Sequence, residues 1–349
     1  MARYYYYLFF LLVFSNCKGQ SRKEQDTEDE YHDFVLVDRQ IWALTNQGKL
    51  SVFDLPGGKR ANGAPTLDSP IIAISKDRHS NIAVASTGKV KIFDRSLKSW
   101  SDLGNYDGRL YGIVFDSANK CFLITNNGIE ELGTHKLYFS DSSMNDQIHY
   151  RKQWSQPNTY CCDRDNNIWI GFGYGEWGGN LLVFNMGRHN FLFPKLGEFK
   201  LELSPIKCIF PADSTVYLSS GLQHMSISGS IIQFDHLDAR FVFASEDSRD
   251  RTENGQYIGP AAFNPSDHCI YFYSQNGIFK GNPEKDLTTI EKWEKVASPK
   301  LTWTYGQPDA VGYSMNVLKM EFTGMNTLVF LTQSDGIGIF DNGKIALFK

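Results

Sequence analysis

GNLLVFN, from Gly179 to Asn185, is one of five segments of this chain that share the pattern Gly-x-apolar-x-apolar-Phe-Asp/Asn. Each is an alternating strand of period two that follows a turn glycine and ends at a turn-forming Asp or Asn. A motif that returns about every 40 to 60 residues indicates a propeller or a solenoid. The other four segments are GKLSVFD (Gly48 to Asp54), GKVKIFD (Gly88 to Asp94), GSIIQFD (Gly229 to Asp235) and the shorter GIGIFD (Gly336 to Asp341).

A second apolar strand precedes each copy, and two more such strands fill the places where the pattern is degraded. A third apolar run lies before each of these strands, and the turns between the two runs are rich in Asp, Asn and Ser, which favour hairpins. The second strands align on seven apolar positions: Ile41, Ile82, Phe122, Ile168, Val216, Ile270 and Leu328.

Seven units of three strands, usually with a weaker fourth, predict an all-β fold. The expected architecture is a seven-bladed β-propeller of four-stranded antiparallel blades over residues 34–349. The composition agrees, with 14% aromatic residues and 30 glycines. Ambiguous segments after Leu55 and from Glu130 to Tyr150 leave counts of six or eight blades open.

One repeat also resembles a known group. DRDNNIWIGFGYGEWGGNLLVFN, from Asp163 to Asn185, is similar to the propeller repeat in the sensor ectodomains of bacterial two-component regulators. The shared pattern is an Asp-rich turn, then Asn-x-Trp-Ile-Gly, then a Gly-rich loop and a strand. The match is good for the fourth unit, partial for the first, second and seventh, and poor elsewhere. The resemblance implies a propeller fold and a role in ligand sensing.

The N-terminus carries a different signal. A single basic residue, Arg3, precedes an apolar stretch from Tyr4 to Phe14, which is shorter than the roughly 20 residues that span a bilayer. A basic start, a short apolar run and small residues are typical of an export signal. Because a cysteine follows, Phe14-Ser15-Asn16-Cys17 is similar to the relaxed lipoprotein boxes of some Gram-negative lineages. This implies cleavage before Cys17 and its acylation. An ordinary signal peptide with an incidental cysteine and a membrane-spanning anchor are the alternatives.

Residues 1–16 are therefore expected to be a lipoprotein signal peptide, and residues 17–33 an acylated cysteine with a disordered tether. The tether, KGQSRKEQDTEDEYHD, is charged and has almost nothing apolar to bury. Acyl chains such as palmitate would hold the protein on a membrane. We expect it in the cell envelope of a Gram-negative bacterium, with the outer membrane favoured and the propeller outside the cytoplasm. The sequence does not determine which leaflet of the membrane would hold the anchor.

Composition narrows the classes of partner that this protein is expected to bind. The formal net charge is −4 and no basic cluster occurs, so nucleic acid is not an expected partner. A monomer is expected. Six cysteines include the proposed lipid site, and the odd remainder favours buried thiols over a disulfide framework, with one inter-blade disulfide as the alternative. The remaining cysteines are Cys121, Cys161, Cys162, Cys208 and Cys269.

The sequence gives little evidence for a metal site or a catalytic site. The eight histidines are scattered, and Asp163-x-Asp165-x-Asn167 only begins like a calcium loop. Ile168 stands where that loop needs glycine, and Tyr174 where it needs a bidentate glutamate, so a hairpin turn is the better interpretation. No cofactor, metal or catalytic residue is predicted. Carboxylates from separate blades could still meet in the central channel.

Ligand-binding residues are expected on one face of the disc. The loops between second and third strands open on the same face as the loops between blades, and several are long and aromatic. Aromatic rings with polar neighbours suit a glycan or a protein hot spot, whereas packing between blades is the alternative for the tryptophans. The candidate ligand-binding residues are Trp154, Tyr174, Glu176, Trp177, Trp303, Tyr305 and Asp309.

Two functional classes follow from these patterns. The first is a lipid-anchored extracytoplasmic binding or scaffold protein that presents its loop face to a protein or carbohydrate partner. The second is a propeller enzyme, either a metal-dependent lactonase-type hydrolase or a sugar-active enzyme, with its site in the central channel. Three or more oxygen ligands converging on one point in the channel would favour the enzyme.

Overall fold

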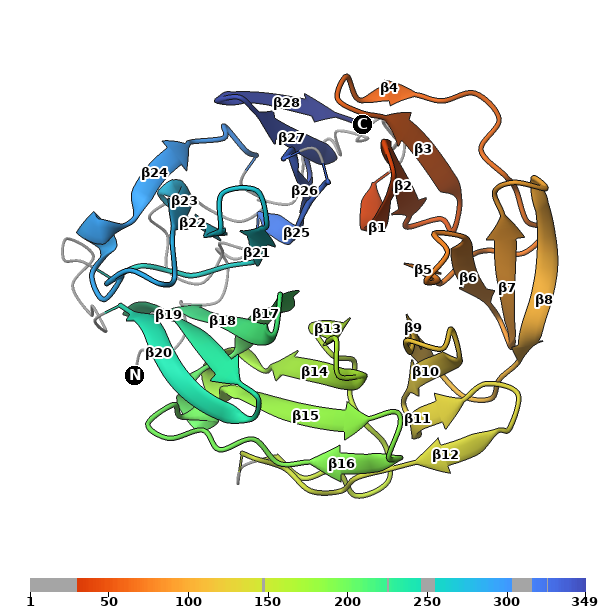
Figure 1. Cartoon of the computed structure of the whole chain (residues 1–349), viewed down its shortest axis with the longest axis horizontal. Coiled ribbons are helices and arrows are strands. Elements are labelled where there is room, and N and C mark those ends of the chain that lie inside the picture. The colour runs from red at the N-terminus through yellow and green to blue at the C-terminus, as the bar shows by residue number, and fades with distance from the viewer. Residues whose placement is uncertain (1–29, 146–147, 225, 246–254, 303–315, 325) are drawn as a thin grey trace, which may run out of the picture.

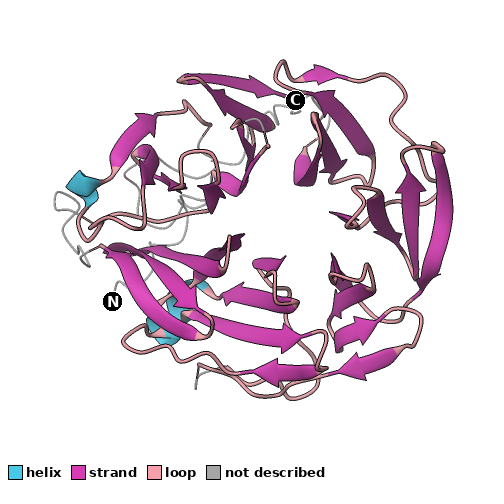
Figure 2. Cartoon of the chain, viewed as in Figure 1, coloured by secondary structure: helices cyan, strands magenta, loops and turns pink. Residues whose placement is uncertain are grey.

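Seven four-stranded antiparallel sheets stand around a central opening in the computed structural model of the chain (Figure 1). The described residues are 30–145, 148–224, 226–245, 255–302, 316–324 and 326–349. Within them, the helical content is three single turns, η1 (Gly175–Trp177), η2 (Leu201–Leu203) and η3 (Ile290–Lys292) (Figure 2). The predicted seven-bladed β-propeller of four-stranded blades is confirmed, and the alternatives of six or eight blades are wrong.

Each blade is one continuous stretch of chain, with its strands in chain order from the innermost to the outermost. Blades 1 to 3 consist of β1 (Tyr31–Val37), β2 (Gln40–Thr45), β3 (Leu50–Asp54), β4 (Lys59–Arg60), β5 (Ala73–Lys76), β6 (Ile82–Ser86), β7 (Lys89–Asp94), β8 (Ser99–Asn105), β9 (Leu110–Phe115), β10 (Cys121–Thr125), β11 (Gly128–Glu131) and β12 (Lys136–Tyr138). Blades 4 and 5 consist of β13 (Thr159–Cys162), β14 (Asn167–Gly173), β15 (Gly179–Asn185), β16 (Asn190–Leu192), β17 (Ile206–Ala212), β18 (Thr215–His224), β19 (Ser226–Asp235) and β20 (Asp238–Ala244). Blades 6 and 7 consist of β21 (Ala261–Asn264), β22 (Cys269–Ser274), β23 (Gly277–Gly281), β24 (Glu294–Ala297), β25 (Val317–Phe322), β26 (Leu328–Thr332), β27 (Ile337–Asp341) and β28 (Lys344–Phe348).

The sequence alignment of the repeats agrees with this arrangement. All seven aligned apolar positions lie on the second strand of their blade and are at most 4% exposed. The segments ending in Phe-Asp or Phe-Asn form third strands, as in β15, which pairs with β14 so that Phe184 faces Ile168. Both strands are buried on both faces, which explains why they read as nearly continuous apolar runs.

The first strand begins earlier than the sequence indicated. β1 starts at Tyr31 rather than at Phe34, so the end of the segment expected to be tether belongs to blade 1. Tyr31 is 3% exposed and packs edge-on against Phe53, with ring centroids 5.8 Å apart. Asp33 forms an ion pair in the central channel. A charged segment with a single aromatic residue concealed this strand, because its contacts come from distant parts of the chain.

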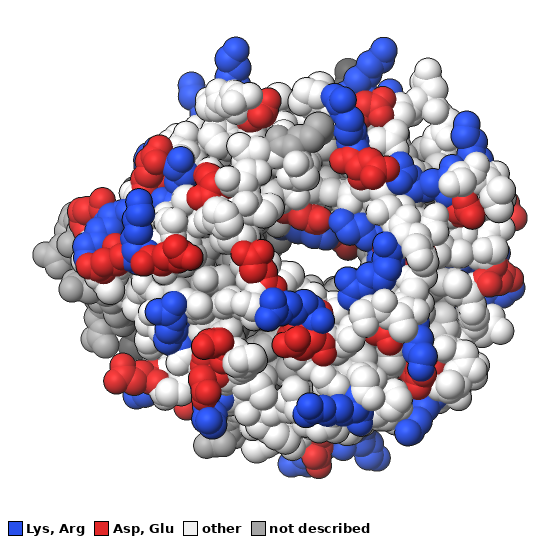
Figure 3. Space-filling view, viewed as in Figure 1, with Lys and Arg blue, Asp and Glu red and all other residues white. Residues whose placement is uncertain are grey.

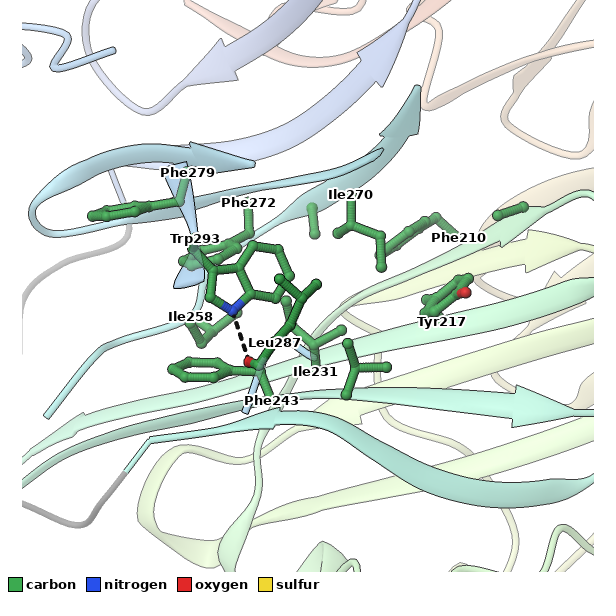
Figure 4. Packing of buried hydrophobic residues seen from close by; sticks show 13 residues of the cluster. Phe210, Tyr217, Ile231, Phe243, Ile258, Ile270, Phe272, Phe279, Leu287 and Trp293 are labelled. Carbon is green, nitrogen blue, oxygen red and sulfur yellow. Dashed lines mark hydrogen bonds between the residues drawn. The ribbon is translucent and has the colours of Figure 1, made fainter. Parts of the chain in front are cut away.

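The hydrophobic core lies between the blades. Figure 4 shows one such cluster, in which side chains of blades 5 and 6 point toward one another. Phe272 of blade 6 packs edge-on against Trp293 with ring centroids 4.9 Å apart, and Phe243 of blade 5 contacts both rings. The indole Nε1 of Trp293 donates to the carbonyl oxygen of Leu287 over 3.0 Å, so its polar atom is satisfied in the core. Each blade therefore depends on its neighbours for burial.

The Asp-rich segment of blade 4 is a hairpin turn, as expected. Oδ1 of Asp163 accepts hydrogen bonds from the backbone amides of Asp165 (2.9 Å) and Asn167 (2.8 Å). Its Oδ2 accepts from the Asn167 amide group and from Nε1 of Trp169, each over 2.8 Å. An aspartate at the same position of blades 2 and 3 also accepts two backbone amides. The carboxylate thus closes the turn, and four donors occupy its oxygens.

Two further observations concern the described residues only. None of their helices has the length and apolar character needed to cross a bilayer. All five described cysteines are free thiols, buried or half-buried, with Cys121 and Cys269 at the start of second strands and the others on innermost strands. This agrees with buried thiols rather than with an inter-blade disulfide.

Candidate functional site

The propeller has two faces with different loops. Because strands alternate in direction, the turns between second and third strands lie on the same face as the connections between blades, which we call the loop face. Hydrogen bonds between the two loop types show this directly: the amide of Trp154 donates to the carbonyl of Asn126 (2.7 Å), and the amide of Ile71 to that of Gly48 (2.9 Å). The other turns form the opposite surface, the hairpin face.

The loop between β14 and β15 presents an exposed tryptophan. It contains the helical turn η1, and the side chain of Trp177 at the end of that turn is 63% exposed. Glu176 beside it is also exposed. The alternative that Trp177 packs between blades therefore does not hold.

Buried groups fix this loop from below. The amide of Asn145, a residue that is 0% exposed, donates to the carbonyl oxygens of Trp177 (3.3 Å) and Gly179 (2.9 Å). Gly178 has φ 75° and lies so close to η2 that a Cβ atom would be 2.2 Å from the carbonyl oxygen of Leu201. Only glycine fits this position, which explains the Gly-rich sequence of the loop.

Tyr174 supports the loop instead of standing free on it. Its ring stacks on Phe172, with centroids 6.1 Å apart, and its hydroxyl contacts those of Tyr150 and Ser155. Burial raises the pKa of Tyr174 above its ordinary value, so the hydroxyl stays protonated at neutral pH. Of the Tyr174 side chain, only a part is accessible to a ligand.

Of the other candidates, the structure buries one and does not describe the rest. Trp154 is 3% exposed and packs between Phe139 and Phe191, and its Nε1 donates to the carbonyl of Ser140 over 3.0 Å. It is therefore a packing residue, because the indole has almost no accessible surface. The remaining candidates, Trp303, Tyr305, Asp309 and the lipidation residue Cys17, lie outside the described residues.

Sequence reasoning missed an apolar neighbour of Trp177. Leu203, at the end of η2, is 66% exposed, and η2 lies directly against the backbone of Gly178. The same connection between blades leads past Phe199, whose ring packs edge-on against the partly exposed Phe241. We call Trp177 and Leu203, on the adjoining turns η1 and η2, the blade 4 patch. A single leucine in a polar loop carries no sequence signal, because its exposure depends on where η2 docks.

Charged side chains gather round the central opening (Figure 3). Two ion pairs join innermost strands: Nζ of Lys76 contacts Glu321 (3.5 Å), and Nζ of Lys319 contacts Asp33 (2.8 Å). Burial raises the pKa of the Cys162 thiol to about 11, which keeps it protonated and weakly nucleophilic at neutral pH. Among the described residues, no group of three or more His, Cys, Asp or Glu side chains is placed to hold a metal ion.

Comparison with solved structures finds similar propellers of low sequence identity. U3-55K matches with a TM-score of 0.56 and 10% identity over 88% of this chain and 89% of its own. The WD40 repeats of RRP9 match with a TM-score of 0.55 and 10% identity over 92% and 95% of the two chains. The computationally designed protein Ika8 matches with a TM-score of 0.51 and 12% identity over 89% and 83%. At these identities the likeness shows the fold alone.

No family model matches this chain, and no characterised protein matches it in sequence. The site must therefore be interpreted from its own residues.

Proposed function

We propose that this propeller is a binding protein that docks a protein partner on the loop face of blade 4. One observation carries the proposal: Trp177 is 63% exposed at the end of a loop whose backbone is held by a fully buried asparagine. In the free protein, a large exposed aromatic ring is in unfavourable contact with water. A partner can bury such a ring with little loss of conformational entropy when the loop that carries it is already rigid.

The neighbours of Trp177 favour a protein surface over a sugar. Leu203 beside it is aliphatic and 66% exposed, and aliphatic side chains add apolar contact area without hydrogen bonds. A glycan site instead needs free polar groups round an aromatic ring, whereas the hydroxyl of Tyr174 already contacts Tyr150 and Ser155. Exposed tryptophans with apolar neighbours are typical of interface hot spots.

The N-terminal sequence adds a location to this proposal. An export signal that is cleaved before Cys17 would leave the protein acylated on Cys17, with the propeller outside the cytoplasm. A tether of about a dozen residues could reach roughly 40 Å when extended. That length allows the loop face to turn toward a partner in the same membrane or in the surrounding compartment. The anchor thus concentrates the binding face at a surface, which strengthens a weak interaction.

Photocrosslinking in living cells tests the binding function. Trp177 is replaced by benzoylphenylalanine, and the matched control carries it at Leu97, which is 75% exposed on the turn between β7 and β8 of the hairpin face. We expect one discrete crosslinked protein from position 177 that is absent from position 97. Excess wild-type propeller should suppress this product, and the Trp177→Ala propeller should not.

Two outcomes would contradict the proposal. One is equal crosslinking from both positions, or none from position 177. The other is a product that is a glycan conjugate, which would assign the blade 4 patch to a carbohydrate ligand.

A further inference from the structure

A second site lies on the opposite face of the molecule. The hairpin turns of blades 4 and 5 enclose a groove of about 520 Å³, which we call the blade 4/5 groove. Its volume falls in the range of about 300 to 1,000 Å³ that is usual for small-molecule sites. Four turns form it, two from each blade, and Arg164, Arg188, Ser214 and His236 lie on these four turns. None of these residues belongs to the loop face.

The walls of the groove are fixed by backbone hydrogen bonds. The turn that carries Arg188 is closed by the Arg188 amide, which donates to Oδ1 of Asn185 over 2.7 Å. On the outer side, the connection between the blades bonds to blade 5, since the amide of Lys195 donates to the carbonyl of Leu237 (2.8 Å) and the amide of Ala239 to that of Lys195 (2.9 Å). The groove is therefore a formed site instead of a gap between mobile loops.

The polar groups on the floor are already engaged. Four donors occupy the carboxylate of Asp163, and the side-chain amide group of Asn185 donates to Oδ1 of Asn167 over 2.6 Å. The apolar floor residues Val216 and Phe234 are 4% and 0% exposed. A ligand must therefore be recognised by the rim.

The rim offers two cations and one carboxylate without partners. Arg164 and Arg188 are exposed, and no described residue forms an ion pair or hydrogen bond with either guanidinium group. Asp165, which follows Arg164 in the chain and also lines the groove, is exposed too, and its carboxylate likewise has no partner among the described residues. Guanidinium groups bind carboxylates and phosphates, often through two parallel hydrogen bonds. A free carboxylate next to them accepts hydrogen bonds from hydroxyl groups but repels an anion.

We propose that the blade 4/5 groove binds an acidic sugar, with its anionic group at Arg164 and Arg188 and its hydroxyl groups at Asp165 and Ser214. This ligand uses both kinds of free rim group. A simple anion would leave the Asp165 carboxylate without a hydrogen-bond donor, and a neutral sugar would leave two guanidinium groups unused. The sugar can be free or the end of a polysaccharide, because both present the same chemistry.

Titration calorimetry of the intact mature protein tests the proposal, with galacturonic acid, its trimer, galactose and inorganic phosphate as probes. We expect both acidic sugar probes to bind and galactose and phosphate to bind at least about tenfold more weakly. Tighter binding of the trimer than of the monomer would assign the groove to a polysaccharide end, and equal binding to a free sugar. Arg164→Gln and Arg188→Gln should each weaken galacturonate binding about three- to tenfold. The matched control, Arg151→Gln, removes an exposed arginine from the loop face and should leave it unchanged.

The Asp165→Asn variant distinguishes the binding of an acidic sugar from the binding of a simple anion. It should lower the ratio of galacturonate affinity to phosphate affinity, because loss of the negative charge favours both anions, whereas only galacturonate loses a charged acceptor for its hydroxyl groups. Phosphate binding as tight as galacturonate binding, an unchanged or higher ratio of galacturonate to phosphate affinity in the Asp165→Asn variant, or no binding of any acidic probe up to about 10 mM would overturn the proposal. Trp177→Ala should not affect galacturonate binding. A failure of the acidic-sugar proposal can therefore be distinguished from a failure of the proposed function.

Discussion

Lys319 of blade 7 donates a hydrogen bond from Nζ to the carboxylate of Asp33 in blade 1, over 2.8 Å, across the junction where the ring closes. The same ammonium group donates to the carbonyl oxygen of Phe34 (2.7 Å) and lies 4.9 Å from the centre of its ring. Blade 1 is built only from N-terminal strands and blade 7 only from C-terminal strands. Within the described residues, side chains and not an exchanged strand therefore join the first blade to the last.

Lys319→Met should destabilise the propeller by about 1–2 kcal/mol, because it leaves Asp33 without its cation. This figure is lower than for a fully buried pair, since the side chains of Lys319 and Asp33 are 36% and 26% exposed in the channel. Chemical denaturation at neutral pH measures the loss. A loss no larger than that of Lys136→Met, which removes an exposed lysine of outer strand β12, would contradict this account of ring closure.

The same variant has a defined pH dependence. Burial lowers the pKa of Lys319, but the carboxylates of Asp33 and Glu321 outweigh that effect and hold the pKa above its ordinary value. A lysine with a raised pKa stabilises the folded state fully below the unfolded pKa of about 10.4, and this contribution falls as the pH rises further. The difference in unfolding free energy between wild type and Lys319→Met should therefore shrink from pH 9 to pH 11. A constant or growing difference would contradict the ion pair.

Lys207, on the innermost strand of blade 5, should behave in the opposite way. Burial lowers its pKa to about 8, so the folded state disfavours the charged form. That penalty is complete below pH 8 and disappears as the pH approaches the unfolded value of about 10.4. Lys207→Met should therefore stabilise the protein relative to wild type at pH 7, and less so at pH 10. Thermal melts at the two pH values measure this, and a larger stabilisation at pH 10 would show that the sign is wrong.

The repeat residues of blade 4 should be core residues by energy as well as by position. Trp169 and Phe184 are both 0% exposed, and the Trp169 ring lies 4.9 Å from that of Phe234 in blade 5. Truncating either to alanine should cost about 3–5 kcal/mol in denaturant unfolding. Leu137→Ala, at a 50% exposed position of the neighbouring blade, is the control. A loss below about 1 kcal/mol for either core variant would contradict the packing described here.

The fold could be predicted from the sequence because its signal is local and repeated. A period of two between a turn glycine and Phe-Asp specifies a strand without knowledge of its partners, as in Gly179 to Asn185. The start of β1 could not be predicted, because Tyr31 packs on Phe53 of another strand and Asp33 pairs with Lys319, which lies far along the chain. The resemblance of blade 4 to the regulator repeat gives the fold correctly, and its implication of ligand sensing stays a prediction.

The candidate site was predictable only in part. Loop phase placed Trp177 on the loop face, and flanking glycines indicated exposure. The same reasoning could not separate Trp177 from Trp154, because burial of Trp154 depends on Phe139 and Phe191. The blade 4/5 groove left no trace in the sequence, since its four turns are ordinary hairpin turns that become a site only where two blades meet.

Cys17→Ala tests the proposed anchor. The variant should lose incorporation of radiolabelled palmitate and should appear in the soluble fraction after cell lysis, because one residue carries all of the acyl chains. The melting temperature of the propeller should not change, since Cys17 precedes the first described strand by more than ten residues. Palmitate that still enters the variant protein would contradict the lipoprotein interpretation.

The central claim is that Trp177 on the loop face of blade 4 binds a protein partner, and the affinity for the crosslinked partner tests it most directly. The dissociation constant of the purified partner is measured by titration with wild type, Trp177→Ala and Leu97→Ala, together with the melting temperature of each. We expect Trp177→Ala to weaken binding by at least about 30-fold, the effect of a hot spot of about 2 kcal/mol, with an unchanged melting temperature. Leu97→Ala should bind like wild type. An unchanged affinity of the Trp177→Ala protein would contradict the claim.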